Sequence, residues 1–175
     1  MIRLDVGRIL SFTGEGHCER LVWWLGSPNG FYCIDIHAPY ASPVFRNRDE
    51  IEDLFAAGLV EEASDPWEHP LAESALTAAQ RDKRDENWAL IQPLIVAQPR
   101  SFNSEHRAAI VDEILATTST SRKTLYRLIR RYWQRGMTPN ALLPDYANSG
   151  APGRPRRAGS EKRGRPTVFG LPGMN

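Results

Sequence analysis

The densest group of side chains able to contact a charged ligand lies in residues 121–136, where six cations occur without an acid. A helix advancing by ~100° per residue places four apolar side chains on one stripe: Leu125, Leu128, Ile129 and Tyr132. The cations fall on the opposite arc. Solvated helices usually alternate Glu and Lys at a spacing of four residues, and this segment has no such compensation. The segment therefore predicts a helix that binds a polyanion, with nucleic acid favoured over a merely solvated face.

Two helices joined by a polar turn are expected to position these cations. Asn103 or Ser104 can cap the first helix, and Thr120 or Ser121 can cap the second. A run of Thr and Ser separates the two. This order is the sequence outline of a helix-turn-helix, with residues 121–134 as its recognition helix.

The place of each polar side chain along the second helix predicts its role on DNA. Early residues of a recognition helix reach base edges, whereas later and flanking residues hold phosphates. Ser121 starts the predicted site, and the base-reading candidates are Arg122, Lys123, Tyr126 and Arg127. The predicted phosphate contacts are Arg130, Arg131 and Arg135. An Arg bound bidentately to guanine would contribute about 1–3 kcal/mol of discrimination.

A second group of cations follows in a tail rich in Gly and Pro, a composition that cannot bury a core. Residues 153–155 and 164–166 both read Gly-Arg-Pro, a short motif that resembles the AT-hook. Extended backbone with Arg beside Pro can lie in a narrow A·T minor groove. The predicted DNA-binding residues here are Arg154, Arg156, Arg157, Lys162, Arg163 and Arg165. The alternative is a basic solvated linker.

The charge of the chain is divided, although its formal net charge is only +1. Residues 1–99 carry 8 Lys/Arg and 16 Asp/Glu, whereas residues 100–175 carry 14 and 5. Such asymmetry indicates a nucleic-acid-binding half beside an acidic half. The chain has neither an apolar run of about 18 residues nor the pattern of a signal peptide. We therefore expect no membrane contact and a cytoplasmic protein that associates with DNA.

The acidic half predicts a small antiparallel β unit with one helix. Its extended runs cover residues 8–13, 19–25 and 31–37. A helix over 49–57 should end at Gly58. Trp23 and Trp24 point to opposite faces of a strand, so at least one packs in the core. The excess of acids argues against a sheet that stacks single-stranded bases.

The predicted fold class is α+β, with four segments along the chain. A β-rich unit covers 1–65, a helical connector 66–100, a helix-turn-helix DNA-binding domain 101–147, and a basic extended linker 148–175. In the connector, residues 72–91 have the composition of a helix. Pro93 is expected to kink or restart that helix.

Nothing in the residues indicates an enzyme or a cofactor. Cys18 and Cys33 lie near His17 and His37, and Cys and His are the usual zinc ligands. Their spacing lacks the close Cys-x-x-Cys pair of compact zinc sites, so we predict no metal. We see no catalytic triad and no phosphate loop, and therefore predict no cofactor, no small-molecule substrate and no catalytic residue.

One long run carries a resemblance to a known family. Residues 132–146, Tyr-Trp-Gln-Arg-Gly-Met-Thr-Pro-Asn-Ala-Leu-Leu-Pro-Asp-Tyr, and then 148–153 resemble the TnsB branch of the Mu-like DDE transposases. The likeness extends more loosely upstream to the β unit and downstream to residue 166. It implies a region that precedes the catalytic domain and helps to bind repeated sites in transposon ends, beside other transposition proteins.

The catalytic domain of that family is RNase H-like and uses two Asp and one Glu to hold two metal ions. Because this chain ends at Asn175, before such a domain could begin, the resemblance assigns no catalytic role to its carboxylates. Two other functions stay open. The chain could be a stand-alone helix-turn-helix regulator, or residues 1–65 could be a protein-interaction module.

Overall fold

The computed structural model describes residues 4–14, 16–68 and 73–145 of the chain. It divides into two units, Met1–Pro144 and Asp145–Asn175. The predicted AT-hook-like tail, with its six DNA-binding candidates, lies outside the described residues. The segment boundaries expected at 65, 100 and 147 stay predictions.

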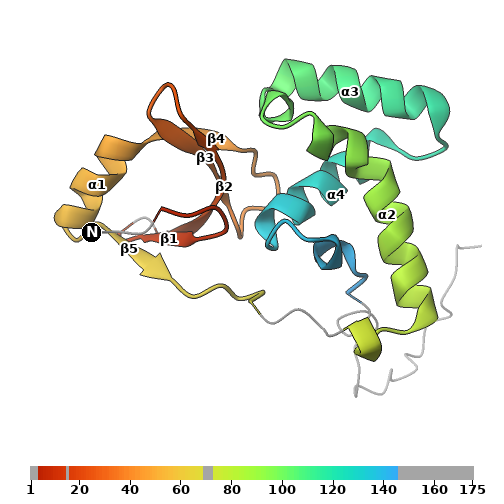
Figure 1. Cartoon of the computed structure of the whole chain (residues 1–175), viewed down its shortest axis with the longest axis horizontal. Helices are drawn as coiled ribbons and strands as arrows, with labels where there is room; N and C mark the ends of the chain where they lie inside the picture. The colour runs from red at the N-terminus through yellow and green to blue at the C-terminus, as the bar shows by residue number, and fades with distance from the viewer. Residues whose placement is uncertain (1–3, 15, 69–72, 146–175) are drawn as a thin grey trace, which may run out of the picture. The chain divides into compact units, whose positions relative to one another are not determined.

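A five-stranded antiparallel sheet in the order β4-β3-β2-β1-β5 forms the beginning of the first unit (Figure 1). Three strands confirm the predicted runs: β1 (Ile9–Phe12), β2 (His17–Leu25) and β3 (Gly30–Asp35). Two strands were not predicted: β4 (Val44–Asn47) and β5 (Val60–Ala63). These two form the edges of the sheet, where β4 pairs with β3 and β5 pairs with β1.

Helix α1 (Arg48–Ala56) covers one face of the sheet. Its bounds lie within one residue of the predicted span, 49–57. Asn47 caps it by accepting a hydrogen bond from the Asp49 amide, and the chain leaves it through Gly58, whose φ is +71°. A left-handed φ is one that glycine adopts without steric cost. Ile51 of α1 is buried against a core that contains Leu10, Phe12, Leu21, Phe31 and Cys33.

A β-bulge in β2 distributes its aromatic residues between the two faces of the sheet. Leu21 pairs with Cys33 and Trp23 with Tyr32, so Val22 is the additional residue. Val22 and Trp23 both pack into the core under the helices, whereas Trp24 packs against the α1 side. Each Trp of the pair therefore contributes to a core, which confirms the expected packing role.

Three further helices share a core with the other face: α2 (Ala78–Val96), α3 (Ser104–Thr117) and α4 (Arg122–Gln134), of which α4 contacts β2 and β3 directly. All four residues of the predicted apolar stripe are buried there, together with Trp133. Val22 and Ile34 of the sheet belong to the same core. Phe102 connects the two parts, because its ring centroid lies 4.8 Å from that of Tyr32 and 5.5 Å from that of Trp133. Sheet and helices thus share one hydrophobic core.

Helix α2 differs from its prediction at both ends. It begins at Ala78, after a Thr77–Gln80 capping box, and not near residue 72. It also runs through Pro93 to Val96 without restarting. Pro93 has no N–H to donate to the carbonyl of Ala89, so the helix lacks one hydrogen bond at this turn. The fully buried Ile91 and Leu94 hold this end of the helix against the core.

The predicted caps of the last two helices are confirmed. The Asn103 side chain accepts hydrogen bonds from the amides of Glu105 and His106 at the start of α3. The Ser121 hydroxyl accepts one from the Thr124 amide at the start of α4, at 3.1 Å. In the described ranges, no helix has the length and apolarity that a membrane span requires.

Candidate nucleic-acid interface

A four-residue connection, Thr118–Ser121, joins α3 to α4. The hydroxyls of Thr117 and Thr118 donate to the carbonyl of Ile114, at 3.1 and 2.8 Å, and so satisfy an acceptor at the end of α3. Ser121 then supplies the cap of α4. Side chains at both helix ends therefore fix the turn that orients the basic helix.

The first half of α4 presents its cations to solvent. Lys123 and Arg127 are exposed and have no hydrogen bond or ion pair within the part of the chain that the structure describes. Arg122 is also exposed and forms an ion pair with Asp112 of α3. The hydrogen bond that Arg122 donates to the Asp112 carboxylate raises the pKa of Arg122 above its usual value. These three predicted residues are brought together on one accessible surface.

Tyr126 is less accessible than its prediction as a base-reading residue implies. It is half-buried and packs against the core shared by the helices. The guanidinium of Arg107 lies 5.9 Å from the centre of its ring. One edge of Tyr126 therefore supports the helix, and its contact with a base stays a prediction.

The second half of α4 is occupied by contacts with the sheet. Arg130 donates from Nε to the carbonyl of Ala41, at 2.9 Å. Gln134 donates from Nε2 to the carbonyls of Asp35, at 2.7 Å, and Ala38, at 2.9 Å. All three acceptors belong to β3 or to the connection between β3 and β4, residues 36–43. We call this connection the β3–β4 loop.

Arg131 and Arg135 also make contacts within the first unit. Arg131 donates from Nε to the carbonyl of Ala141, at 2.8 Å, and from Nη2 to that of Leu143. The Arg135 guanidinium lies 5.7 Å from the ring of Trp67. Arg131 thereby fixes the short 3-10 helix Pro139–Leu142 beside α4. The roles of both residues in holding phosphates stay predictions.

The buried Arg20 connects the end of α4 to the sheet. Its side chain is 1% exposed and donates two hydrogen bonds of 2.7 Å to Asp65. It also donates to the carbonyls of Gly7, at 2.9 Å, and Gln134, at 3.1 Å. Burial opposes ionisation of Asp65, but its hydrogen bonds from Arg20 and the Trp67 amide outweigh that effect and hold its pKa below the usual value.

Arg107 is a second buried cation that the sequence did not single out. It is 6% exposed, and Nη1 donates to the carbonyls of Ser101 and Phe102, each at 2.9 Å. Burial lowers the pKa of Arg107. For Arg20 the available signal was a cation directly before the apolar Leu21 and Val22 in a predicted strand. For Arg107 the sequence offers no comparable signal.

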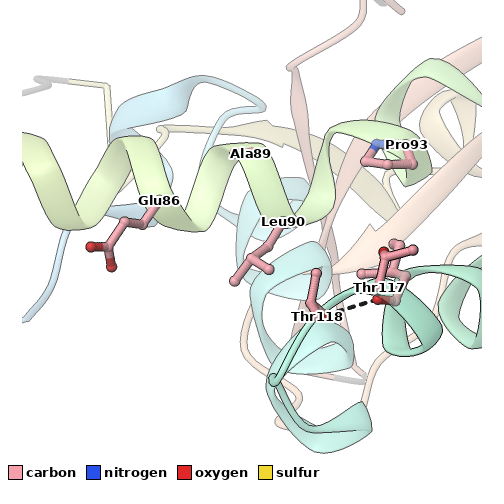
Figure 2. A pocket seen from close by; sticks show the side chains of 7 residues that line it. Glu86, Ala89, Leu90, Pro93, Thr117 and Thr118 are labelled. Carbon is pink, nitrogen blue, oxygen red and sulfur yellow. Dashed lines mark hydrogen bonds between the residues drawn. The ribbon is translucent and has the colours of Figure 1, made fainter.

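A shallow pocket between α2 and the end of α3 has a different character. Figure 2 shows side chains that line it, including Leu90 and Pro93 of α2 and the two threonines that end α3. Its lining contains Glu86 but no Lys or Arg. The pocket therefore lacks the charge that a phosphate requires. Among the residues placed by the structure, no group of three His, Cys, Asp or Glu side chains could hold a metal ion.

Comparison with known proteins found two similar sequences. Residues 84–146 match the family model of the TnsB second domain. This stretch includes α3, the turn, α4 and most of α2. The chain is also 41% identical over 115 residues to "Transposon Tn7 transposition protein TnsB" of Escherichia coli. That alignment covers 65% of this chain and 16% of the relative, so the chain spans a small part of the relative's length. Together the two matches support the resemblance of this chain to an N-terminal region of a TnsB-type transposase.

Proposed function

We propose that the chain binds double-stranded DNA sequence-specifically at transposon ends, as the recognition part of a transposition protein. In this function α3 and α4 act as a helix-turn-helix, with α4 in the major groove. The observation that carries it is the accessible cationic half of α4, formed by Arg122, Lys123 and Arg127, within the matched second domain. The described residues recognise DNA and perform no chemical step.

The contacts of Arg122 suit a residue that reads a base. Arg pairs bidentately with the O6 and N7 atoms of guanine in the major groove. Its ion pair with Asp112 is solvent-exposed, with side-chain exposures of 49% and 60%. An exposed pair of this kind contributes little to stability, so Arg122 can exchange Asp112 for guanine at small cost. Before DNA binds, Asp112 orients the guanidinium of Arg122 at the start of α4.

Lys123 and Arg127 supply the part of the affinity that does not depend on sequence. They lie four residues apart and therefore on one face of α4. A cation that neutralises a duplex phosphate releases a counterion, so each such contact adds about 0.9 to the slope of log affinity against log salt concentration. Binding should therefore weaken steeply as salt rises, while the preference given by Arg122 should persist.

The acidic side of the sheet favours a second role, in contact with another transposition protein. Exposed carboxylates lie on α1 and on the edge strand β5: Asp49, Glu50, Asp53, Glu61 and Glu62. Such a surface repels DNA and attracts a basic protein surface. This role is compatible with DNA binding by α4. A stand-alone regulator would instead be expected to dimerise over half-sites one helical turn apart.

The test begins with selection of a preferred duplex from a randomised pool by the intact chain. Fluorescence anisotropy then compares the selected duplex with a scrambled duplex of equal composition, at two salt concentrations. We expect a preference of about a hundredfold, which lies below the usual range for specific proteins and suits a single module. Replacing Arg122 with Ala should reduce that preference, and replacing Lys123 or Arg127 should weaken binding to both duplexes.

Lys83 provides the matched control, because it is an exposed cation on α2, outside the proposed interface, and pairs with Glu86. Lys83→Ala should leave both affinities unchanged. Equal binding to both duplexes that disappears with salt would reduce α4 to a non-specific basic patch. Sedimentation of the free chain and of its complex would separate the regulator, which dimerises, from a monomeric recognition region.

A further inference from the structure

The β3–β4 loop continues the cationic face of α4 toward its C-terminal end. Lys123, Arg127, Arg130 and Gln134 follow one another at helical spacing and share one stripe of α4. The first two make no hydrogen bond within the described residues, whereas Arg130 and Gln134 donate to carbonyls of β3 and the loop. A duplex lying along this stripe would therefore meet the loop directly after Arg127, about one helical turn further on.

Tyr40, at the centre of the loop, is the residue that such a duplex would meet. It is 86% exposed, and the guanidinium carbon of Arg130 lies 5.8 Å from the centre of its ring. A single exposed aromatic residue is ordinary by itself. The position of Tyr40 is the distinguishing feature, because hydrogen bonds to Ala38 and Ala41 hold the loop on both sides of it.

The Nη groups of Arg130 are hydrogen-bond donors that lie beside the Tyr40 ring. Arg130 donates only from Nε, so its two Nη groups have no hydrogen-bond acceptor within the described part of the chain. It is half-buried, and no carboxylate in that part pairs with it. Burial lowers its pKa, as expected for a cation that lacks a compensating anion.

The surroundings of the loop add further positive charge. Nη2 of Arg107 lies 3.4 Å from the Ser42 hydroxyl, and no carboxylate among the placed residues pairs with Arg107. The nearby Asp35 carboxylate is engaged within the loop, where it accepts hydrogen bonds from the amides of His37 and Ala38. Two arginines without acid partners therefore flank residues 40–42. Such a site is complementary to an anion.

We propose that Tyr40 and Arg130 form a clamp for one backbone phosphate of the duplex that α4 enters. The Tyr40 hydroxyl and the Arg130 Nη groups donate to the phosphate oxygens, and Arg107 contributes positive potential from beneath the loop. This inference rests on the proposed function and gives the β unit a direct part in DNA binding. Phosphate contacts position a protein on the duplex without reading its sequence.

Tyr40→Phe isolates the hydroxyl, because it keeps the ring that Arg130 covers. On an exposed residue this change should leave the thermal unfolding midpoint unaltered. A hydrogen bond to a charged phosphate corresponds to roughly tenfold in affinity. We therefore expect about tenfold weaker binding of Tyr40→Phe to both the selected and the scrambled duplex. Arg130→Gln should give a similar loss and lower the salt slope by about one.

The contacted phosphate can be identified with duplexes in which one phosphate at a time is replaced by a neutral methylphosphonate. At the contacted phosphate, the methylphosphonate should weaken binding by the unsubstituted chain. The same methylphosphonate should not weaken binding by Tyr40→Phe any further, because that variant has already lost the contact. Tyr32→Phe, in which the hydroxyl is removed from a half-buried ring of the sheet, is the matched control.

Several outcomes would overturn the clamp. If Tyr40→Phe binds like the unsubstituted chain while Tyr40→Ala binds weakly, the ring stacks on a base and the phosphate contact is wrong. If Arg127→Ala weakens binding but neither Tyr40→Phe nor Arg130→Gln does, the clamp fails while DNA binding by α4 stands. If the unsubstituted chain does not bind duplex DNA at all, both proposals fail together.

Discussion

Replacing Arg20 with Met should strongly destabilise the first unit, because a single buried side chain joins three partners in separate segments. The substitution keeps an unbranched chain of similar length but removes the hydrogen bonds to Asp65, Gly7 and Gln134. Breaking a buried ion pair by removing one partner typically costs about 3–5 kcal/mol. Asp65 is 22% exposed, so water compensates for part of the loss, and we expect about 3 kcal/mol. For a domain of this size, that corresponds to a midpoint about 6–12 °C lower.

Urea unfolding followed by tryptophan fluorescence measures this loss directly. Arg48→Met is the matched control, because Arg48 is 42% exposed and pairs with Glu52 on the same helix. Such an exposed pair contributes about 0.5 kcal/mol or less. Equal losses for the two variants, or a loss below about 1 kcal/mol for Arg20→Met, would refute the reasoning that the buried pair anchors α4.

The pH dependence gives an independent check on the same pair. The folded-state pKa of Asp65 is depressed, so its contribution to stability is present above the unfolded pKa of about 3.9 and is lost as the pH falls through the lower folded value. The difference in stability between the unsubstituted chain and Arg20→Met should therefore be complete at pH 7 and shrink below about pH 4. A difference that stays constant down to pH 2 would show that ionised Asp65 is not responsible.

Three further predictions concern the turn, the basic helix and the buried thiol. Asp112→Ala should strengthen duplex binding in an anisotropy titration, because it removes a negative charge beside Arg122 without disturbing a core residue; unchanged or weaker binding would contradict this. Ser121→Ala should lower the unfolding free energy by about 1 kcal/mol in thermal unfolding through loss of the α4 cap, whereas an unchanged midpoint would show that the cap is dispensable. Cys33 should resist iodoacetamide at pH 8 until the chain unfolds, because burial raises the pKa of its thiol. Mass spectrometry should show that the half-buried Cys18 is modified first.

The parts of the fold that follow from local patterns could be predicted from the sequence. The apolar stripe of α4, its cap at Ser121 and the strand pattern of β2 depend on neighbours within a few residues. The edge strands β4 and β5 could not be predicted in this way. Each has only four residues, and β5 reads Val-Glu-Glu-Ala, which has little strand propensity. It becomes a strand because β1 offers it a free edge.

The candidate interface could be predicted only in part for the same reason. The residue pattern of α4 describes one continuous cationic face opposite the core. In the structure, Arg130 and Gln134 in the second half of α4 instead donate hydrogen bonds to residues far away in the sequence. These contacts depend on how the sheet packs against the helix. Periodicity within one helix holds no information on such tertiary contacts. Arg122, Lys123 and Arg127 are exposed, as the pattern predicts, and their contact with DNA stays a prediction.

The hydrophobic core that contains Val22, Ile34 and Trp133 together makes folding of the sheet and helices interdependent. Residues 84–146, the matched domain, would by themselves expose the side of α4 and Phe102 that the sheet covers. Equilibrium unfolding of the first unit should therefore be a single cooperative transition, and the boundary of the family match is not a boundary of folding. Deleting residues 1–65 would remove the sheet that packs against α4, together with any binding surface on the sheet itself. Point substitutions on the surface, such as Tyr40→Phe and Lys123→Ala, are consequently the changes that separate DNA binding from folding.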